Sequence, residues 1–198
     1  SRVFGVAPEA VEYEMRRRAK VINFGILYGM GVNALREQLG TTREDAQAFL
    51  TRYFETFTQL EAYLTKTKAT ATRLGYTTTL FGRKRFFPGL KSKLPFVRAS
   101  SERMAINAPM QGSQADMIKL AMVNIQERIE KDFAKSVKMV LQIHDELIFE
   151  VKDDALPAFT PVAKELMESV LSKEDAQGVP IIVSSEAGPS WGEMETLQ

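Results

Sequence analysis

Residues 16–31, RRRAKVINFGILYGMG, are the most informative stretch of the chain because they place cations, aromatic rings and apolar residues at helical spacing. At about 100° per residue, one slowly drifting stripe carries two cations and then two rings: Arg16, Lys20, Phe24 and Tyr28. A second stripe, between a quarter and half a turn away, is apolar and consists of Met15, Ala19, Ile22 and Ile26. The apolar stripe predicts a core face. The other suits a ligand that joins phosphates to a base and a sugar, although an ordinary amphipathic helix with solvated cations is the alternative.

Composition places the chain among globular proteins with one large domain or two small ones. Its 198 residues are 44% hydrophobic and 26% charged. The lack of cysteine excludes disulfides and thiolate metal sites and permits a reducing compartment. No apolar run approaches a membrane span and the first residues do not resemble a secretion signal, so we expect no membrane partner and a cytoplasmic location. The absence of an initiator methionine suggests a chain cut from a longer one.

Charge is unevenly distributed along the chain. Between Arg83 and Arg103 there are seven basic residues and one acid, whereas between Asp145 and Asp175 there are nine acids and three lysines. The net charge of +1 argues against a simple polycationic nucleic-acid binder. The two zones suit a protein that holds a polyanion with one part and metal cations with another, and merely uneven surface charge is the alternative.

Periodicity and capping signals predict a helical first part, with helices over about 13–30, 33–40, 41–54 and 59–75. Asn33 is the expected cap of the second helix. Thr41 and Glu44 form an expected capping box for the third. Gly75 closes the fourth because glycine tolerates the left-handed conformation at a helix end.

The middle of the chain predicts a short strand, a basic tip and two helices. Residues 76–80 are rich in threonine and aromatic residues, as in a strand, and the basic stretch GRKRFFPG at 82–89 follows. This tip either contacts nucleic-acid phosphates, a role that cations serve without reading sequence, or is an ordinary exposed loop. Pro109 is expected to separate a helix at 98–107 from a longer one at 112–133.

A second chemical centre lies in residues 138–152, KMVLQIHDELIFEVK. Two apolar arms around His-Asp-Glu predict an antiparallel hairpin whose tip projects carboxylates. Adjacent acids repel each other unless they are solvated or neutralised by a divalent ion, and magnesium prefers such oxygen ligands. An exposed turn with ordinary acids is the alternative.

The last part of the chain predicts a helix and a strand. Residues 154–172 are mostly helical, and Pro157 and Pro161 are expected to confine the regular helix to the later part. Residues 179–184 are apolar and β-branched, and we expect them to join the hairpin in a small antiparallel sheet.

Two motifs in a fixed order resemble the family A DNA polymerases. The first is R-R-x-A-K-x-x-N-F-G-x-x-Y-G at residues 16–29, a more specific pattern than a lone glycine motif, and it resembles the family's fingers helix. The second, Q-I-H-D-E at 142–146, resembles the family's palm motif C. The resemblance covers essentially the whole chain. It implies an α+β fold with helix-dominated fingers, about 1–82, and the C-terminal part of a palm, about 83–198, that contains a small antiparallel sheet.

The resemblance also implies a role for each residue of the first stripe. Arg16 and Lys20 would clamp the triphosphate of a deoxynucleoside triphosphate (dNTP), and Lys20 would donate a proton to the departing pyrophosphate. Phe24 would pack against the incoming sugar, and Tyr28 would guard the insertion pocket beside the template base.

Primer–template DNA is the second implied partner. In S-E-R-M-A-I-N-A-P-M-Q-G the matching Arg103, Asn107 and Gln111 would face the minor groove, where acceptors are placed equivalently for every base pair. On residue pattern alone, Asn107 as a cap with Gln111 opening the next helix is the favoured alternative. The resemblance places His144 near the primer end, and the basic tip, including Arg83 and Arg85, on phosphates.

The implied reaction is attack of the primer 3′-hydroxyl on the α-phosphate of a dNTP with two magnesium ions. Asp145 would be a metal ligand and catalytic carboxylate, and Glu146 a neighbouring carboxylate of secondary importance. The family's second metal-binding aspartate lies in a D-Y-S-x-x-E-L-R motif that these residues do not contain. We therefore expect the chain alone to polymerise weakly or not at all.

Rival functions depend on the single histidine and the missing aspartate. A metal phosphohydrolase needs several histidines, and a Ser-His-Asp hydrolase would depend on His144 without a G-x-S-x-G elbow. The remaining alternative is a duplex-DNA-binding fragment without catalysis.

Overall fold

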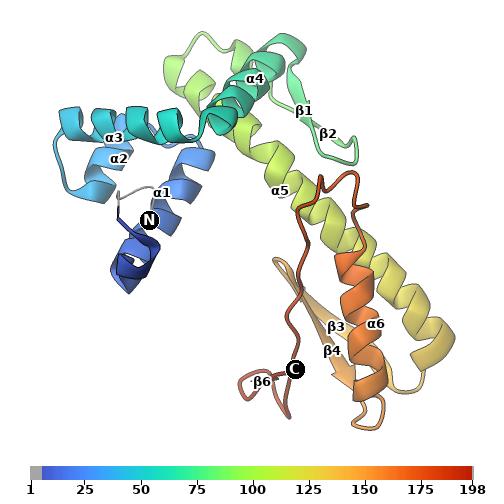
Figure 1. Ribbon diagram of the computed structural model, residues 1–198. Helices are drawn as coiled ribbons and strands as arrows, with labels where there is room; N and C mark the ends of the chain where they lie inside the picture. The colour runs from blue at the N-terminus through green and yellow to red at the C-terminus, as the bar shows by residue number, and fades with distance from the viewer. Residues whose placement is uncertain (1–5, 198) are drawn as a thin grey trace. The chain divides into compact units, whose positions relative to one another are not determined.

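The computed structural model describes residues 6–197, and the boundary between its two compact units falls between Gly112 and Ser113. The first unit is built mainly from helices (Figure 1). Its elements before the long helix are η1 (Pro8–Ala10), α1 (Tyr13–Leu27), α2 (Val32–Leu39), α3 (Arg43–Thr56), α4 (Thr58–Leu74), β1 (Tyr76–Thr78), β2 (Lys84–Phe86) and η2 (Pro88–Lys91).

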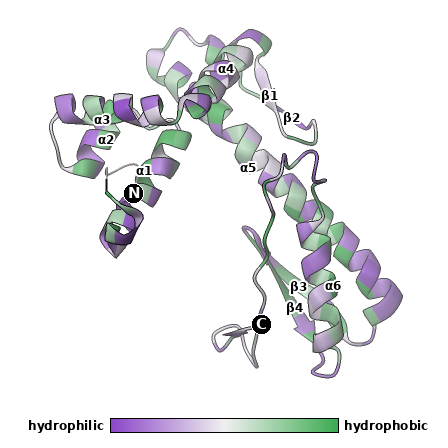
Figure 2. Cartoon of the chain, in the orientation of Figure 1, coloured by the Kyte–Doolittle hydropathy of each residue, from purple (hydrophilic) through white to green (hydrophobic). Residues whose placement is uncertain are grey.

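The first core of this unit joins α1, α2 and α3. Its buried members are Ile22, Ile26, Leu35, Ala46 and Tyr53. Hydrophobic and hydrophilic residues alternate along α3, as the bands of colour in Figure 2 show, because only one face of this helix is buried. A separate buried cluster lies between α4, the segment after β2 and the following helix, and contains Ala71, Phe87, Leu90, Ala105 and Ala108.

Helix ends confirm some predicted signals and correct others. Gly40 and Gly75 end α2 and α4 with φ of 64° and 81°. The residue that caps α2 is Gly31 rather than Asn33. The cap of α3 is Thr42 rather than Thr41, and its hydroxyl accepts a hydrogen bond from the backbone N–H of Asp45 at 3.1 Å.

The strand predicted at 76–80 is present but covers only residues 76–78, and the following tip is not simply a loop. Its central residues form β2, which pairs antiparallel with β1 so that Tyr76 faces Phe86 and Thr78 faces Lys84. Side chains of the two strands also interact. The Nζ atom of Lys84, on β2, lies 4.8 Å from the centre of the Tyr76 ring, on β1. These pairings stabilise a strand where composition alone indicated an exposed turn.

The predicted break at Pro109 is wrong. A single helix, α5 (Pro95–Arg128), runs through this residue and continues as one π-helical turn, η3 (Ile129–Phe133). Proline removes one backbone donor, but Ala105 and Ala108 on one side and Ile118 on the other are buried and hold the helix by packing. The two expected helices are therefore one.

The second unit contains the rest of α5, a hairpin and one further helix. Strands β3 (Val137–Ile143) and β4 (Glu146–Val151) pair antiparallel, as predicted, and the register shifts between Met139 and Leu141. Helix α6 (Leu156–Glu168) packs on the hairpin through Phe159. The rings of Phe133 and Phe149 each meet the Phe159 ring with planes at 71°. The resulting core consists of Ile125, Ile129, Val137, Phe159 and Ala163.

Two expectations for the last part of the chain are wrong. Helix α6 begins at Leu156 and includes both prolines. Pro157 lies in its first turn, where no intrahelical donor is needed, whereas Pro161 lies inside the helix. Residues 179–184 form no strand; the N–H of Val183 instead donates to Glu168 Oε1 at 2.9 Å. The strands near this segment are β5 (Glu186–Ala187) and β6 (Glu195–Thr196), which pair with each other.

The fold class is confirmed as helix-dominated α+β with small antiparallel sheets, each of two strands among residues 6–197. Within the same residues, no helix is both long enough and apolar enough to cross a membrane.

Candidate nucleotide and nucleic-acid site

Helix α1 presents the predicted cation and ring stripe to solvent. Its opposite face is buried, since Ile22 and Ile26 are 1% and 2% exposed. Arg16 and Lys20 are exposed, and no ion pair or hydrogen bond holds either side chain within residues 6–197. Their neighbour Arg17, by contrast, pairs with Glu14 at 3.0 Å. The two stripe cations are therefore available to an anion.

The two rings of the stripe lie next to each other at the C-terminal end of α1. Phe24 and Tyr28 are 45% and 41% exposed, and their ring centres are 6.0 Å apart with planes at 28°. Both rings are therefore accessible, and burying them against a ligand would be favourable. The stacked rings form an apolar surface one to three turns from the cations.

The last turn of α1 is linked to α5 through a glycine. Gly29 has φ of 79°, and a Cβ at this position would lie 2.8 Å from Cγ of Arg103. Only glycine therefore suits both the backbone conformation and the space that the arginine stem occupies. This packing places Arg103 beside the residue that follows Tyr28, a contact that the sequence alone did not indicate.

Because α5 is unbroken, the three predicted minor-groove residues share one helix face. Arg103, Asn107 and Gln111 follow each other at intervals of four residues, or about 6 Å along the axis. Arg103 and Gln111 are exposed. Oδ1 of Asn107 is buried and has no hydrogen-bond partner within residues 6–197, which argues against a capping role. An unsatisfied acceptor of this kind calls for an explanation by a ligand or by water.

The predicted phosphate contacts of the basic tip differ in their surroundings. Nη2 of Arg83 donates to the carbonyl of Gly112 at 3.1 Å, so this side chain fastens the β1–β2 hairpin to α5. The guanidinium of Arg85 lies 5.4 Å from the centre of the buried Phe87 ring. Both residues are exposed overall, and their contact with DNA stays a prediction.

The β3–β4 hairpin projects the other predicted residues. Ile143 pairs with Glu146, so His144 and Asp145 form the two-residue tip, and all three polar residues of His-Asp-Glu are exposed. His144 has φ of 51°, a region that side chains other than glycine enter at a cost. Nε2 of Gln142 donates to the carbonyl of His144 at 2.8 Å and stabilises this conformation.

The tip offers two carboxylates to a divalent ion but not a complete ligand set. Asp145 and Glu146 supply hard oxygen donors of the kind that magnesium prefers. Among residues 6–197 there is no group of three or more histidine, aspartate or glutamate side chains able to hold a metal ion. These two residues therefore fit a metal that takes its remaining ligands from substrate, water or further protein. Lys20 and Asp145 belong to different units, and their convergence on one ligand stays a prediction.

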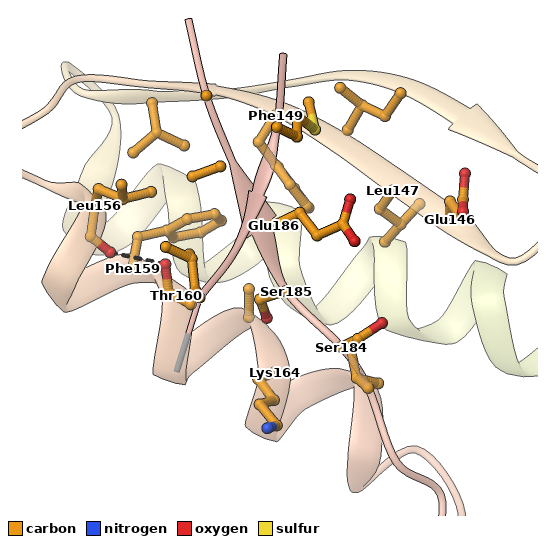
Figure 3. A pocket seen from close by; sticks show the side chains of 18 of the residues that line it. Glu146, Leu147, Phe149, Leu156, Phe159, Thr160, Lys164, Ser184, Ser185 and Glu186 are labelled. Atoms are coloured by element: carbon orange, nitrogen blue, oxygen red, sulfur yellow. Dashed lines mark hydrogen bonds between the residues drawn. The ribbon is translucent and has the colours of Figure 1, made fainter. Parts of the chain in front are cut away.

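A cavity of about 820 Å³ lies within the second unit, between the hairpin, α6 and the segment from 182 onward. Figure 3 shows Phe149 and Phe159 on its apolar side and Glu146 and Glu186 among its polar groups. Thr160 turns its hydroxyl away to the carbonyl of Leu156 at 2.9 Å. Asp145 and Glu146 are also among the residues that line the cavity, so the cavity adjoins the hairpin tip.

Comparisons with known proteins agree on one family. A family model described as DNA polymerase family A matches residues 1–193. The chain is 44% identical over 189 residues to the thermostable DNA polymerase I of Thermus aquaticus, covering 96% of this chain and 22% of the relative. It is 43% identical to DNA polymerase I of Rhizobium leguminosarum, covering 98% of this chain and 19% of the relative. This chain thus spans about a fifth of the length of these relatives.

A solved structure is similar in fold. It is described as the POL domain of Pol1 from M. smegmatis in complex with a DNA primer–template and dNTP, and it matches with a TM-score of 0.83 and 38% identity. The match covers 86% of this chain and 30% of the other.

Proposed function

This chain belongs to DNA polymerase family A, and from that membership we propose that it forms the nucleotide-binding fingers and part of the palm of a DNA-directed DNA polymerase. The proposed reaction is transfer of a nucleotidyl group from a dNTP to a primer 3′-hydroxyl. Residues 1–82 are the proposed fingers and residues 83–198 the palm portion. We also propose a cytoplasmic location.

The exposed stripe of α1 is the observation on which the proposal rests. Arg16 and Lys20 have no protein partner within residues 6–197, so they are available to bind triphosphate oxygens through charge-assisted hydrogen bonds. The stacked rings of Phe24 and Tyr28 provide the apolar surface for the sugar and base. Lys20 is also the proposed proton donor to the departing pyrophosphate, because an ammonium stabilises the charge that develops there.

The polar face of α5 described above is the proposed contact with duplex DNA. Arg103, Asn107 and Gln111 present donors along one helix face, about 6 Å apart, so each would reach a different base pair, because neighbouring pairs are about 3.4 Å apart. The role does not require sequence readout, because minor-groove acceptors are equivalent for all pairs. His144 is the proposed contact near the primer end, and Arg83 and Arg85 bind phosphates of the DNA backbone.

The hairpin tip is the proposed metal-binding part. Asp145 would be a ligand and Glu146 a second, weaker carboxylate for magnesium, with two ions in the complete enzyme and a further aspartate supplied from outside these residues. When bound, the metal lowers the pKa of the attacking hydroxyl and stabilises the leaving oxygen. The chain's own contribution is to hold two carboxylates at a rigid turn, free of protein cations within the described residues.

Nucleotide binding tests the first part of this proposal. A fluorescent dNTP should bind the 198-residue chain, and a Lys20→Ala change should weaken binding by about tenfold or more, the scale of one charge-assisted hydrogen bond. Arg18→Ala is the matched control, because Arg18 is an exposed cation of α1 outside the stripe. Equal losses for both variants would show only a general charge effect and contradict a nucleotide clamp.

A duplex-binding fragment without catalysis is the second candidate. It is favoured by the incomplete ligand set at the hairpin tip within residues 6–197. Primer extension by the purified chain with magnesium or manganese separates the two functions. No incorporation together with salt-sensitive duplex binding would favour the fragment, and Arg85→Ala, which removes a proposed phosphate contact, should then lower the salt slope by about one, whereas Arg73→Ala should not.

A further inference from the structure

One hydrogen bond joins the core of the first unit to the helix that carries the nucleotide stripe. The hydroxyl of Tyr53, in α3, donates to Oδ1 of Asn23, in α1, at 2.8 Å. Tyr53 is 6% exposed and belongs to the buried cluster with Ile22 and Ile26. The bond joins residues that are thirty positions apart in the sequence.

Asn23 lies at the edge between the buried face and the stripe of α1. With Ile22 as the origin and about 100° per residue, Ile26 lies at about 40° and Asn23 at about 100°. The stripe begins just beyond, with Arg16 at about 120° and Lys20 at about 160° by the same period. Asn23 therefore lies at the boundary between the buried face of α1 and the exposed stripe, and a hydrogen bond to it holds α1 at that boundary.

The remaining contacts between α1 and its core are non-directional. Ile22 and Ile26 bury apolar surface against Leu35, Ala46 and the Tyr53 ring, and such burial depends on area rather than on angle. A hydrogen bond is directional and weakens steeply when its geometry is lost. Within the buried cluster of the described first unit, the Tyr53–Asn23 bond is thus the contact best able to fix the rotation of α1 about its own axis.

The tyrosine is itself held firmly. Its ring meets Phe57 with centres 4.8 Å apart and Phe54 at 5.7 Å with planes at 84°. Burial raises the pKa of the Tyr53 hydroxyl above its usual value, so the group keeps its proton and remains a donor at neutral and moderately alkaline pH. Rotation of the donor is therefore restricted by packing, and the acceptor must follow it.

We infer that Tyr53 is a positioning residue for the nucleotide stripe: through Asn23 it sets the direction in which α1 points Lys20 and Phe24. The inference rests on the proposed function, because it assigns a use to the stripe. It needs no contact between Tyr53 and the ligand.

Two measurements on the same variants test this inference. Tyr53→Phe keeps the ring and removes the donor, and Tyr63→Phe is the matched control, since Tyr63 is 40% exposed on α4. For fluorescent dNTP, Tyr53→Phe should raise the dissociation constant about five- to tenfold and the control should leave it within about twofold, as expected for a single hydrogen bond. In a complete polymerase that carries this segment, the change should appear in KM for dNTP rather than in kcat.

The second measurement does not depend on nucleotide binding. Because the chain has no cysteine, Arg18→Cys and Glu44→Cys give unique spin-label positions on exposed sites of α1 and α3. Double electron–electron resonance between the two labels should give one narrow distance distribution in the labelled chain that keeps Tyr53 and in the same chain with Tyr63→Phe. The distribution should broaden or shift in Tyr53→Phe.

Asn23→Leu supplies the coupling test. If Tyr53 acts through Asn23, then Tyr53→Phe should have no further effect on the label distances in the Asn23→Leu background. Unchanged distances in Tyr53→Phe would overturn the inference, whatever the nucleotide data. Changed distances with unchanged nucleotide affinity in a chain that binds dNTP would overturn it as well. If the parent chain binds no dNTP, the proposed function fails for this chain, and the label distances alone decide whether Tyr53 sets the rotation of α1.

Discussion

Helix α1 and the β3–β4 tip both expose predicted site residues, but they orient them by different means. On α1 the backbone is regular, and the direction of the exposed stripe depends on how the face that carries Ile22 and Ile26 meets the core and on the bond from Tyr53 to Asn23. At the hairpin tip the turn itself aims the side chains, and His144 is held at φ of 51°. Site geometry on α1 therefore depends on distant core residues, whereas at the tip it depends on the turn and its neighbours.

The difference predicts that substitutions of the exposed carboxylates at the tip affect chemistry without affecting folding. Asp145→Asn, made in a complete polymerase that carries this segment, should lower kcat by about 100- to 1000-fold, the scale of losing a group that stabilises transition-state charge. Asp145 is exposed, so the thermal unfolding midpoint should stay unchanged. Primer-extension kinetics and a melting curve check both parts.

Glu146→Gln provides the comparison at the next position. It should cost markedly less activity than Asp145→Asn, because Glu146 is the carboxylate of secondary importance. An equal loss at both positions would assign them equal roles and contradict this ranking.

The corresponding change on α1 should have the next largest effect. Lys20→Ala should lower kcat/KM about 10- to 100-fold, because a charge-assisted hydrogen bond to phosphate contributes about 1.5–3 kcal/mol. Single-nucleotide incorporation kinetics measure the loss. The helix content measured by circular dichroism of the whole protein should not change, since Lys20 is exposed and alanine favours helix. A fall in helicity would mean that the effect is structural.

Gly29→Ala tests how far the stripe depends on its packing. It should lower the free energy of unfolding by about 1–2 kcal/mol through the left-handed conformation alone, and further because the new Cβ would lie 2.8 Å from Cγ of Arg103. Gly40→Ala is the matched control, with φ of 64° and no atom within 4 Å of the added Cβ. Denaturant unfolding of both variants separates the two costs. If Gly40→Ala destabilised as much as Gly29→Ala, the Arg103 contact would contribute nothing.

His144→Gly should have the smallest effect and the opposite sign. Removing the side chain relieves a left-handed conformation that costs about 1–2 kcal/mol, offset by about 0.5–1 kcal/mol from the greater freedom of glycine when unfolded. The net expectation is a stabilisation of up to about 1.5 kcal/mol, together with weaker primer-end binding. Unfolding measurements and primer affinity report the two effects, and a destabilised variant would show that His144 supports the turn through contacts of its own.

Local signals in the sequence predicted several elements correctly. The α1 stripe, the glycines that close α2 and α4, and the His-Asp tip all follow from spacing over a few residues. Errors arose where distant packing outweighs local preference. Helix α5 runs through Pro109 because buried residues on either side hold it, and residues 179–184 form no strand because the N–H of Val183 is taken by Glu168.

The same division holds for the candidate site. The residues of the site could be predicted from the motifs, but two contacts that hold those residues in place could not. Arg103 packs on Gly29, and Tyr53 bonds to Asn23, across separations of many residues that no local period encodes. No pattern in the sequence pointed to Tyr53.

The sequence by itself determined which side chains carry charge, rings and carboxylates, and which helix face or hairpin tip presents them, because those properties depend on a period of a few residues. The tertiary structure alone decided that Arg103, Asn107 and Gln111 lie on one unbroken helix, and which core residues orient α1. Packing joins residues that are far apart in the chain, and its outcome depends on the shapes of all of them together.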